Sequence, residues 1–171
     1  MTVAVKTGLW QLDAVRSAVA IEHKTMWGMV TVKGAFSGVT GEGEVQPDGT
    51  ARGVVTLDAA SLDTKNAKRD AHLRGADFFD AERHPSLVFA IRDAVLRQDD
   101  TLEVNGELTV RGVSRPQSAT ARVTESSADA LTLTTEFTVD RERFGLSWNQ
   151  LGMMRGLTTV TSTLRFTRTP A

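Results

Sequence analysis

Residues 64–85 read Thr-Lys-Asn-Ala-Lys-Arg-Asp-Ala-His-Leu-Arg-Gly-Ala-Asp-Phe-Phe-Asp-Ala-Glu-Arg-His-Pro, and they form the one long segment with helical character. Leu73 follows Asp70 by three residues, which is the spacing of side chains that meet on a helix face. Gly75 is expected just beyond the end of this helix, in the left-handed conformation that glycine adopts easily. Pro85 requires an extended residue before it and so ends the segment. The stretch therefore predicts a short helix that interrupts two series of strands.

A turn with two adjacent aromatic residues, Phe78 and Phe79, follows the predicted helix. A charged helix joined to a pair of phenylalanines is suited to covering an apolar interior. We therefore expect a short helix and lid segment near residues 64–80.

The segments on both sides of this stretch alternate between apolar and polar residues, as antiparallel strands with one buried face do. The clearest alternations run over residues 102–111, 131–140 and 160–167. Turn residues separate about eight such segments, a pattern typical of an all-β sandwich or barrel. A closed barrel of about eight strands is just wide enough to hold one small ligand.

Small residues occupy several positions on the inward faces of these strands: Gly34, Gly106, Ala119, Ala121, Thr135 and Ser162. Small inward residues leave room inside a barrel. The alternative is that phenylalanine, tryptophan and methionine side chains fill this room and give an ordinary dry core. Alternation alone does not decide between these two interpretations.

Length and charge exclude several classes of protein. A chain of 171 residues is expected to form one domain, residues 1–171, with a sizeable core. The net charge of −1 argues against binding to nucleic acid or to an anionic membrane surface. The sequence has no cysteine and no apolar segment long enough to span a bilayer. Because no signal-peptide run follows Met1, we expect a cytoplasmic protein.

Several motifs resemble those of the YceI-like proteins, lipocalin-like barrels that bind polyisoprenoid lipids. The most specific is Arg69-Asp70-Ala71-His72-Leu73, followed by Asp77-Phe78-Phe79-Asp80 and His84-Pro85. Trp10-Gln11-Leu12-Asp13, Gly106-Glu107-Leu108-Thr109-Val110 and Arg143-Phe144-Gly145 extend the likeness over nearly the whole chain. The resemblance implies an elongated, eight-stranded antiparallel barrel with an apolar tunnel.

The resemblance also implies a function, which is to bind, sequester or transport an isoprenoid lipid such as a polyprenyl phosphate or a prenylated quinone. No cofactor is expected besides this lipid, and no metal. The inward apolar residues expected to line the tunnel are Val19, Val32, Phe36, Phe89, Leu108, Leu133, Phe137 and Leu164. The residues expected to form the lid or mouth are Met26, Trp27, Leu73, Phe78, Phe79, Trp148 and Met153. Charged replacements of Phe78 and Phe79 are expected to abolish lipid retention and leave the fold intact.

Three polar residues, His23, Arg69 and His72, are candidates for contact with a lipid head group. The alternative for Arg69 and His72 is a structural role in fixing the helix to the barrel. The spacing of the histidines fits no compact metal motif, and no nucleophile or phosphate-loop motif is present.

Three alternatives remain open. An interaction or stress-response module would carry only an incidental cavity, and a lipid-modifying enzyme would use His23 or His72 as a base. The aromatic and methionine clusters could simply plug the ends of the barrel. An exposed side of the barrel could also support a homodimer.

Overall fold

The computed structural model of the protein describes residues 5–146 and 156–169, and within them strands predominate. The strands are β1 (Gly8–Leu12), β2 (Ala18–Thr25), β3 (Val30–Phe36), β4 (Val39–Val45), β5 (Ala51–Asp58), β6 (Leu62–Asp63), β7 (Ser86–Leu96), β8 (Thr101–Val110), β9 (Val113–Ser126), β10 (Ala130–Val139) and β11 (Thr158–Arg168). One α-helix, α1 (Ala67–Arg74), and four short 3-10 turns, η1 (Ala14–Arg16), η2 (Met26–Gly28), η3 (Ala59–Ser61) and η4 (Arg141–Phe144), complete the described elements.

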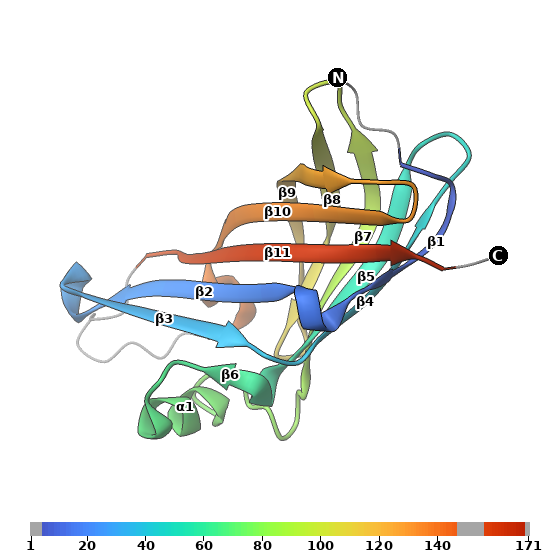
Figure 1. Cartoon of the computed structure of the whole chain (residues 1–171). Helices are drawn as coiled ribbons and strands as arrows, with labels where there is room; N and C mark the ends of the chain where they lie inside the picture. Colours follow the sequence, from blue (N-terminus) through green and yellow to red (C-terminus); the bar gives the residue numbers. More distant parts are fainter. Residues whose placement is uncertain (1–4, 147–155, 170–171) are drawn as a thin grey trace.

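Eight of the strands close into an antiparallel barrel, in the order β1-β4-β5-β7-β8-β9-β10-β11, as predicted. The ring closes where β1 pairs with β11, with Trp10 opposite Arg168 and Leu12 opposite Phe166. Strands β2, β3 and β6 continue the same sheet from the other half of β11. In Figure 1 the β2–β3 hairpin extends beyond the ring, which gives the barrel its elongated outline.

The turn between β8 and β9 is shorter than the sequence indicates. Gly112 and Pro116 in the sequence indicate a turn over residues 112–116, but Val113 already pairs with Val110 and β9 starts there. Arg111 and Gly112 alone form the turn, with φ values of 53° and 73°. A two-residue hairpin with positive φ at both positions matches the twist of the flanking strands. The two-residue turn therefore fixes the register between β8 and β9.

At one end of the barrel, the first half of β9 and the second half of β10 are not paired with each other. The paired segment of these strands ends at Thr135 opposite Ala121, while β10 continues to Val139 along β11 alone. Pro116 pairs with Glu107 of β8 and lies in the half of β9 that has no partner in β10. Proline is tolerated in a strand where its position next to an unpaired side needs no ladder N–H. The η4 turn packs against β9 there, and Arg115 Nε donates to the carbonyl of Arg143 at 3.2 Å.

The helix α1 lies beside β6, below β3 in Figure 1. Its first turn is capped by Asn66, whose side chain accepts a hydrogen bond from the Arg69 N–H at 3.0 Å. The helix ends at Arg74, and the Gly75 N–H donates to the His72 carbonyl at 3.1 Å. The prediction of a left-handed Gly75 is wrong, because its φ of −79° and ψ of −180° are extended. The chain therefore leaves the helix through an extended residue and not through a left-handed turn.

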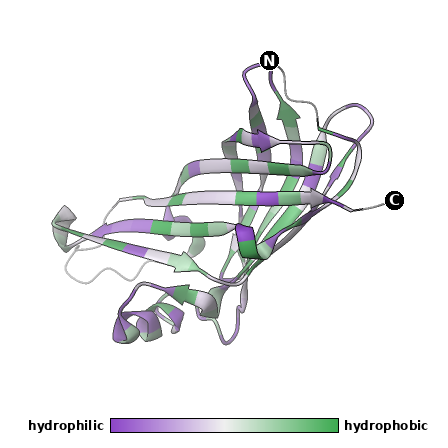
Figure 2. Ribbon diagram, viewed as in Figure 1, coloured by the Kyte–Doolittle hydropathy of each residue, from purple (hydrophilic) through white to green (hydrophobic). Residues whose placement is uncertain are grey.

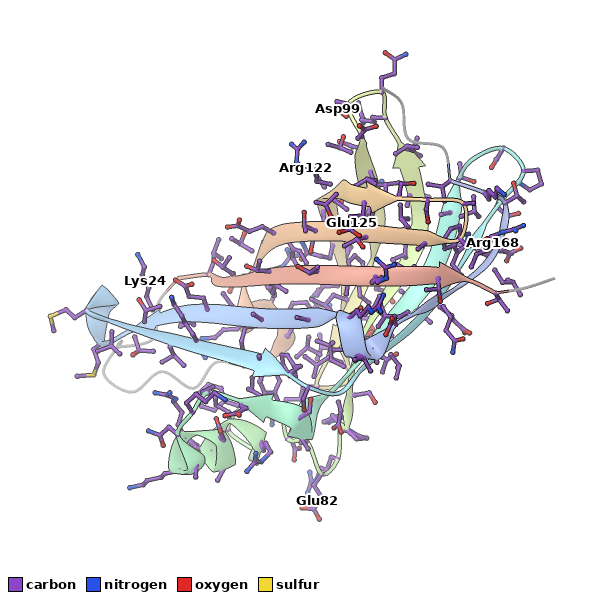
Figure 3. The ribbon with its side chains drawn as sticks, viewed as in Figure 1. Lys24, Glu82, Asp99, Arg122, Glu125 and Arg168 are labelled. Carbon is purple, nitrogen blue, oxygen red and sulfur yellow. The ribbon has the colours of Figure 1, made fainter. Side chains whose placement is uncertain are left out.

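Hydrophobic and hydrophilic residues alternate along the strands, as Figure 2 shows for β2, β3 and β11. The charged side chains of Lys24, Arg122 and Glu125 project away from the barrel in Figure 3. The inward residues form two buried clusters, one around Trp10, Phe36 and Phe144, and a smaller one that includes Leu102 and Val104. Among the described residues, no helix is both long and apolar enough to cross a membrane.

Candidate ligand-binding cavity

A cavity of about 520 Å³ lies inside the barrel and reaches from one buried cluster to the other. Its wall includes Trp10 and Phe36 of the larger cluster and Leu102 and Val104 of the smaller one. The volume falls within the range of about 300–1,000 Å³ that is usual for small-molecule sites. The sequence left a dry core and an open interior as alternatives, and the structure has the open interior.

The cavity follows two adjacent strands over most of their length. The inward row of β10 consists of Leu131, Leu133, Thr135, Phe137 and Val139. The neighbouring inward row, on β11, consists of Thr158, Val160, Ser162, Leu164 and Phe166. Each row begins and ends eight residues apart along its strand. At about 3.3 Å per residue, this separation is roughly 26 Å. The cavity is therefore elongated along the strands.

Seven of the eight residues predicted to line a tunnel lie on the wall of this cavity: Val19, Phe36, Phe89, Leu108, Leu133, Phe137 and Leu164. Val32 does not line it, and its placement was wrong. Val32 pairs with His23 in the β2–β3 extension, beyond the closed ring of strands. Alternation gives the correct face for Val32 but not its position along the axis of the barrel.

The space next to the small inward residues is filled by other protein atoms at some positions and belongs to the cavity at others. A Cβ atom on Gly106 would lie 2.5 Å from Cε1 of Phe89 and even closer to the Ala90 carbonyl oxygen. A Cβ atom on Gly34 would lie 2.9 Å from both Leu62 Cδ1 and Thr64 Cγ2. Other protein atoms therefore occupy the room at these two glycines, side chains at Gly34 and both the Phe89 ring and the Ala90 backbone at Gly106. Ala119, Thr135 and Ser162, in contrast, line the open cavity.

The predicted lid residues are divided between the cavity and the core. Phe79 lines the cavity and meets Phe36 edge to face, with ring centroids 6.2 Å apart. Phe78 is a core residue, 4% exposed, and it does not line the cavity. Its carbonyl accepts a hydrogen bond from Arg111 Nη1 at 3.2 Å, which fixes the turn to the β8–β9 hairpin. The expectation that charged replacement of both phenylalanines leaves the fold intact is therefore wrong for Phe78.

The other predicted lid residues lie away from the described cavity. Leu73 is half-buried and packs against the larger core cluster. Met26 is 40% exposed in η2, and for Trp27 the structure describes the backbone only. Trp148 and Met153 lie outside the described residues.

Two of the three candidate head-group residues are engaged on α1. Arg69 donates from Nε to Thr64 Oγ1 at 2.8 Å and from Nη2 to the Thr64 carbonyl at 2.7 Å. The His72 ring lies 3.1 Å from a carboxylate oxygen of Asp77 at the protein surface. Buried Asp70 accepts hydrogen bonds from the N–H and hydroxyl of Thr64. The Thr64 contacts fix α1 to the preceding loop, and the His72–Asp77 contact joins it to the following turn. Neither Arg69 nor His72 lines the cavity.

The third candidate, His23, does not line the cavity, but it hydrogen-bonds to Thr158, one of two polar lining residues that sequence reasoning missed. His23 continues the inward row of Val19 and Ile21 on β2, and its Nδ1 lies 2.9 Å from Thr158 Oγ1. Arg141 of η4 is 6% exposed and lines the cavity, and its Nη1 donates to the Leu146 carbonyl. Arg141 has the same parity as Val139, so continuing the alternation of β10 by one step would have found it.

Burial controls the protonation of His23 and Arg141. Desolvation lowers the pKa of the His23 imidazole, and the positive charge of Arg141 lowers it further. Desolvation also lowers the pKa of the Arg141 guanidinium, while Glu142 and Asp140 act in the opposite direction. An arginine in a protein keeps its charge. The result is a neutral histidine next to a buried cation.

The middle of the cavity is almost entirely apolar. Thr135 and Ser162 hydrogen-bond to each other across β10 and β11, so these two hydroxyls satisfy each other. Within the described residues, no group of three or more histidine and carboxylate side chains is arranged to hold a metal ion.

Comparison with known proteins gives a family and a set of structural neighbours. The YceI-like domain matches residues 10–167 of the chain. A UPF0312 protein of Vibrio cholerae is 38% identical over 87 residues, which are 50% of this chain and 46% of that protein. Protein YceI of Escherichia coli O157:H7 is 38% identical over 69 residues, which are 40% of this chain and 36% of that protein. These matches span less than half the length of either relative.

Two solved structures have the same fold at low sequence identity. Burkholderia cenocepacia BcnA has a TM-score of 0.81 and 20% identity, covering 90% of this chain and 98% of that chain. A polyisoprenoid binding domain from Saccharophagus degradans, implicated in plant cell wall breakdown, has a TM-score of 0.75 and 15% identity. The alignment with it covers 96% of this chain and 100% of that chain. These similarities confirm the predicted barrel.

Proposed function

The chain belongs to the YceI-like family, and we propose that it binds one polyisoprenoid lipid inside its barrel and does not transform it. The observation that carries the proposal is the elongated apolar cavity inside the barrel, which runs along β10 and β11. The polyisoprenoid binding domain of Saccharophagus degradans, which has the same fold, supports the choice of lipid class.

The energetics of burial favour a long hydrocarbon as the ligand. Each CH₂ group removed from water contributes about 0.8 kcal/mol, so ten of them give about 8 kcal/mol before ordering costs. The phenylalanines at 36, 89 and 137 give the wall broad apolar surfaces for branched hydrocarbon. An apolar tail alone therefore supplies useful affinity.

Binding without conversion agrees with how the interior polar groups are used. The Thr135 and Ser162 hydroxyls in the middle of the cavity hydrogen-bond to each other. Two hydroxyls that satisfy each other present no activated nucleophile to the contents of the channel. A polyprenyl phosphate or a prenylated quinone, sequestered or carried between sites of use, is the ligand that we propose.

The proposal is tested by native mass spectrometry of the protein purified from an isoprenoid-producing host, with identification of the lipid in a solvent extract. The blocking variant is Ala119→Trp, because Ala119 lines the cavity. Its matched control is Thr120→Trp, one residue along β9, where the side chain is exposed on the other face.

We expect about one isoprenoid per wild-type or Thr120→Trp chain and little on Ala119→Trp. Absence of lipid from all three proteins, after added geranylgeraniol also fails to bind, would reject the proposal. It would favour an interaction module with an incidental cavity. Recovery of a chemically altered lipid would instead favour an enzyme.

A further inference from the structure

The exposed part of the cavity wall lies at one end of the barrel. Among the described lining residues, five are exposed: Glu42, Asp48, Gly49, Arg52 and Val95. Four of them belong to the β4–β5 hairpin, and Val95 lies near the end of β7. In Figure 1 the β4–β5 and β7–β8 hairpins both point away from α1. The cavity therefore opens to water between these two hairpins.

The strands β5 and β7 separate at this open end. Their pairing ends at Ala51 opposite Ala94, and β7 then continues to Leu96 in pairing with β8. The chain before Ala51 instead turns back into β4, where Val45 pairs with Ala51. Ala51 and Leu96 both line the cavity. The two hairpins thus form the two sides of a mouth.

The opposite end of the cavity is lined by buried residues. Arg141 is 6% exposed, Phe144 is 3% exposed and Leu146 is 5% exposed, and all three line the cavity. Polar groups at this end already contact other parts of the protein. Arg141 Nη1 donates to the Leu146 carbonyl, and the Thr158 hydroxyl hydrogen-bonds to His23.

The polarity of the wall determines how an amphiphilic ligand fits. Glu42, Asp48 and Arg52 place charged groups at the mouth. The wall farther inside carries apolar residues such as Phe89 and Phe137. A polar head group passing these rings would lose its hydration without gaining hydrogen-bond partners. A hydrocarbon tail gains free energy along the same path, because it leaves water for apolar surroundings.

We propose that the lipid enters the barrel tail first between the β4–β5 and β7–β8 hairpins, and that its head group stays at this mouth in contact with water. The inference rests on the proposed function, because it assigns an entrance and an orientation to the same ligand. The protein accordingly selects the isoprenoid tail and accepts head groups too large for the cavity.

The orientation is tested on delipidated wild-type protein with farnesol that carries a nitroxide spin label on its hydroxyl. The label broadens amide signals of nearby residues in the nuclear magnetic resonance spectrum. We expect loss of the Gly49 and Val95 signals at the mouth, while those of Thr158 and Val160 at the other end persist. Farnesol without the label is the control. Loss of the Thr158 and Val160 signals alone would overturn the orientation.

The entrance is tested by stopped-flow fluorescence with the anthraniloyl ester of farnesol. Ala51→Trp places a large ring at the mouth, so we expect association and dissociation both to slow about tenfold or more. The matched control is Gln98→Trp, at an exposed position in the β7–β8 turn that does not line the cavity, and wild-type rates are expected for it. Leu157→Trp, next to Thr158 at the opposite end, is also expected to keep wild-type rates.

The outcomes separate this inference from the proposed function. Wild-type rates in Ala51→Trp, or slow exchange in Leu157→Trp instead, would overturn the entrance and leave lipid binding standing. If Ala51→Trp does not fold, Thr50→Trp, at the adjacent lining position, takes its place. If wild-type protein binds neither farnesol nor its esters, the proposed function itself fails.

Discussion

Burial holds the His23 imidazole in its neutral form. Desolvation is the larger cause of its lowered pKa, and the nearby charge of Arg141 adds to it. Between the pKa of the unfolded chain, near 6.5, and the lower pKa of the folded state, the unfolded chain binds more protons. The stability contributed by neutral His23 is therefore complete above pH 6.5 and is lost as the pH falls below it.

The corresponding prediction concerns His23→Gln. We expect the free energy of unfolding of wild-type protein to fall as the pH drops from about 7.5 to about 5, above the usual range of carboxyl titration. The variant should show a smaller slope, because glutamine does not titrate. Chemical denaturation at several pH values measures both slopes. Equal slopes in the two proteins would contradict this account of His23.

Gly106 is a position where adding a single Cβ atom would disturb the packing. Gly106→Ala would place a Cβ atom against the Phe89 ring and the Ala90 carbonyl. Overpacking of this kind costs about 1–3 kcal/mol. We expect this loss in the free energy of unfolding, measured by urea denaturation. The control is Gly43→Ala, whose Cβ atom would meet only the Arg52 carbonyl oxygen at 3.4 Å. An equal effect of both substitutions would mean that crowding at Phe89 is not the cause.

The sequence predicted which face of a strand a residue lies on better than it predicted which residues a side chain contacts. It placed Leu133, Phe137 and Leu164 on the inward face, and they line the cavity. It did not show that Arg69 is tied to Thr64, because residue identity does not give the direction of a long side chain. It also missed Arg141, since the irregular segment after Val139 hid the continuing parity of the row.

At the scale of elements, hydrogen bonds hold α1 to the loop before it and hold the turn after it to the barrel. Asp70 binds the Thr64 N–H and hydroxyl within the protein, and Arg111 binds the Phe78 carbonyl from the β8–β9 hairpin. The Phe79 N–H also donates to the Leu73 carbonyl at 3.0 Å. The charged sequence of the helix predicted its place at the edge of the apolar interior but not these attachments.

The turn after α1 gives a prediction that separates core from cavity. Phe78→Ala is expected to lower the free energy of unfolding by about 3–5 kcal/mol, because a buried aromatic side chain is lost. Chemical denaturation provides the measurement. Val15→Ala, at a position that is 95% exposed, is the control and should change stability by less than about 0.5 kcal/mol. A loss below about 1 kcal/mol for Phe78→Ala would show that this ring is not part of the core.

At the scale of the whole molecule, closure of eight strands encloses a space that the inward side chains do not fill. Alternation and turn spacing predicted the all-β class, and the family resemblance implied a closed barrel. The size of the cavity did not follow from the sequence. It depends on where large rings such as Phe89 lie, and Phe89 fills the room at Gly106 while Ala119 and Ser162 leave theirs open.

The central claim is that an isoprenoid chain lies along β10 and β11 inside the barrel. Intermolecular nuclear Overhauser effects between a bound isoprenoid and methyl-labelled protein test it most directly. We predict contacts from the methyl groups of Leu133, Val160 and Leu164, which line the cavity, and none from exposed Leu9 or Val15. Contacts confined to exposed methyl groups, with none from the three interior residues, would contradict the claim.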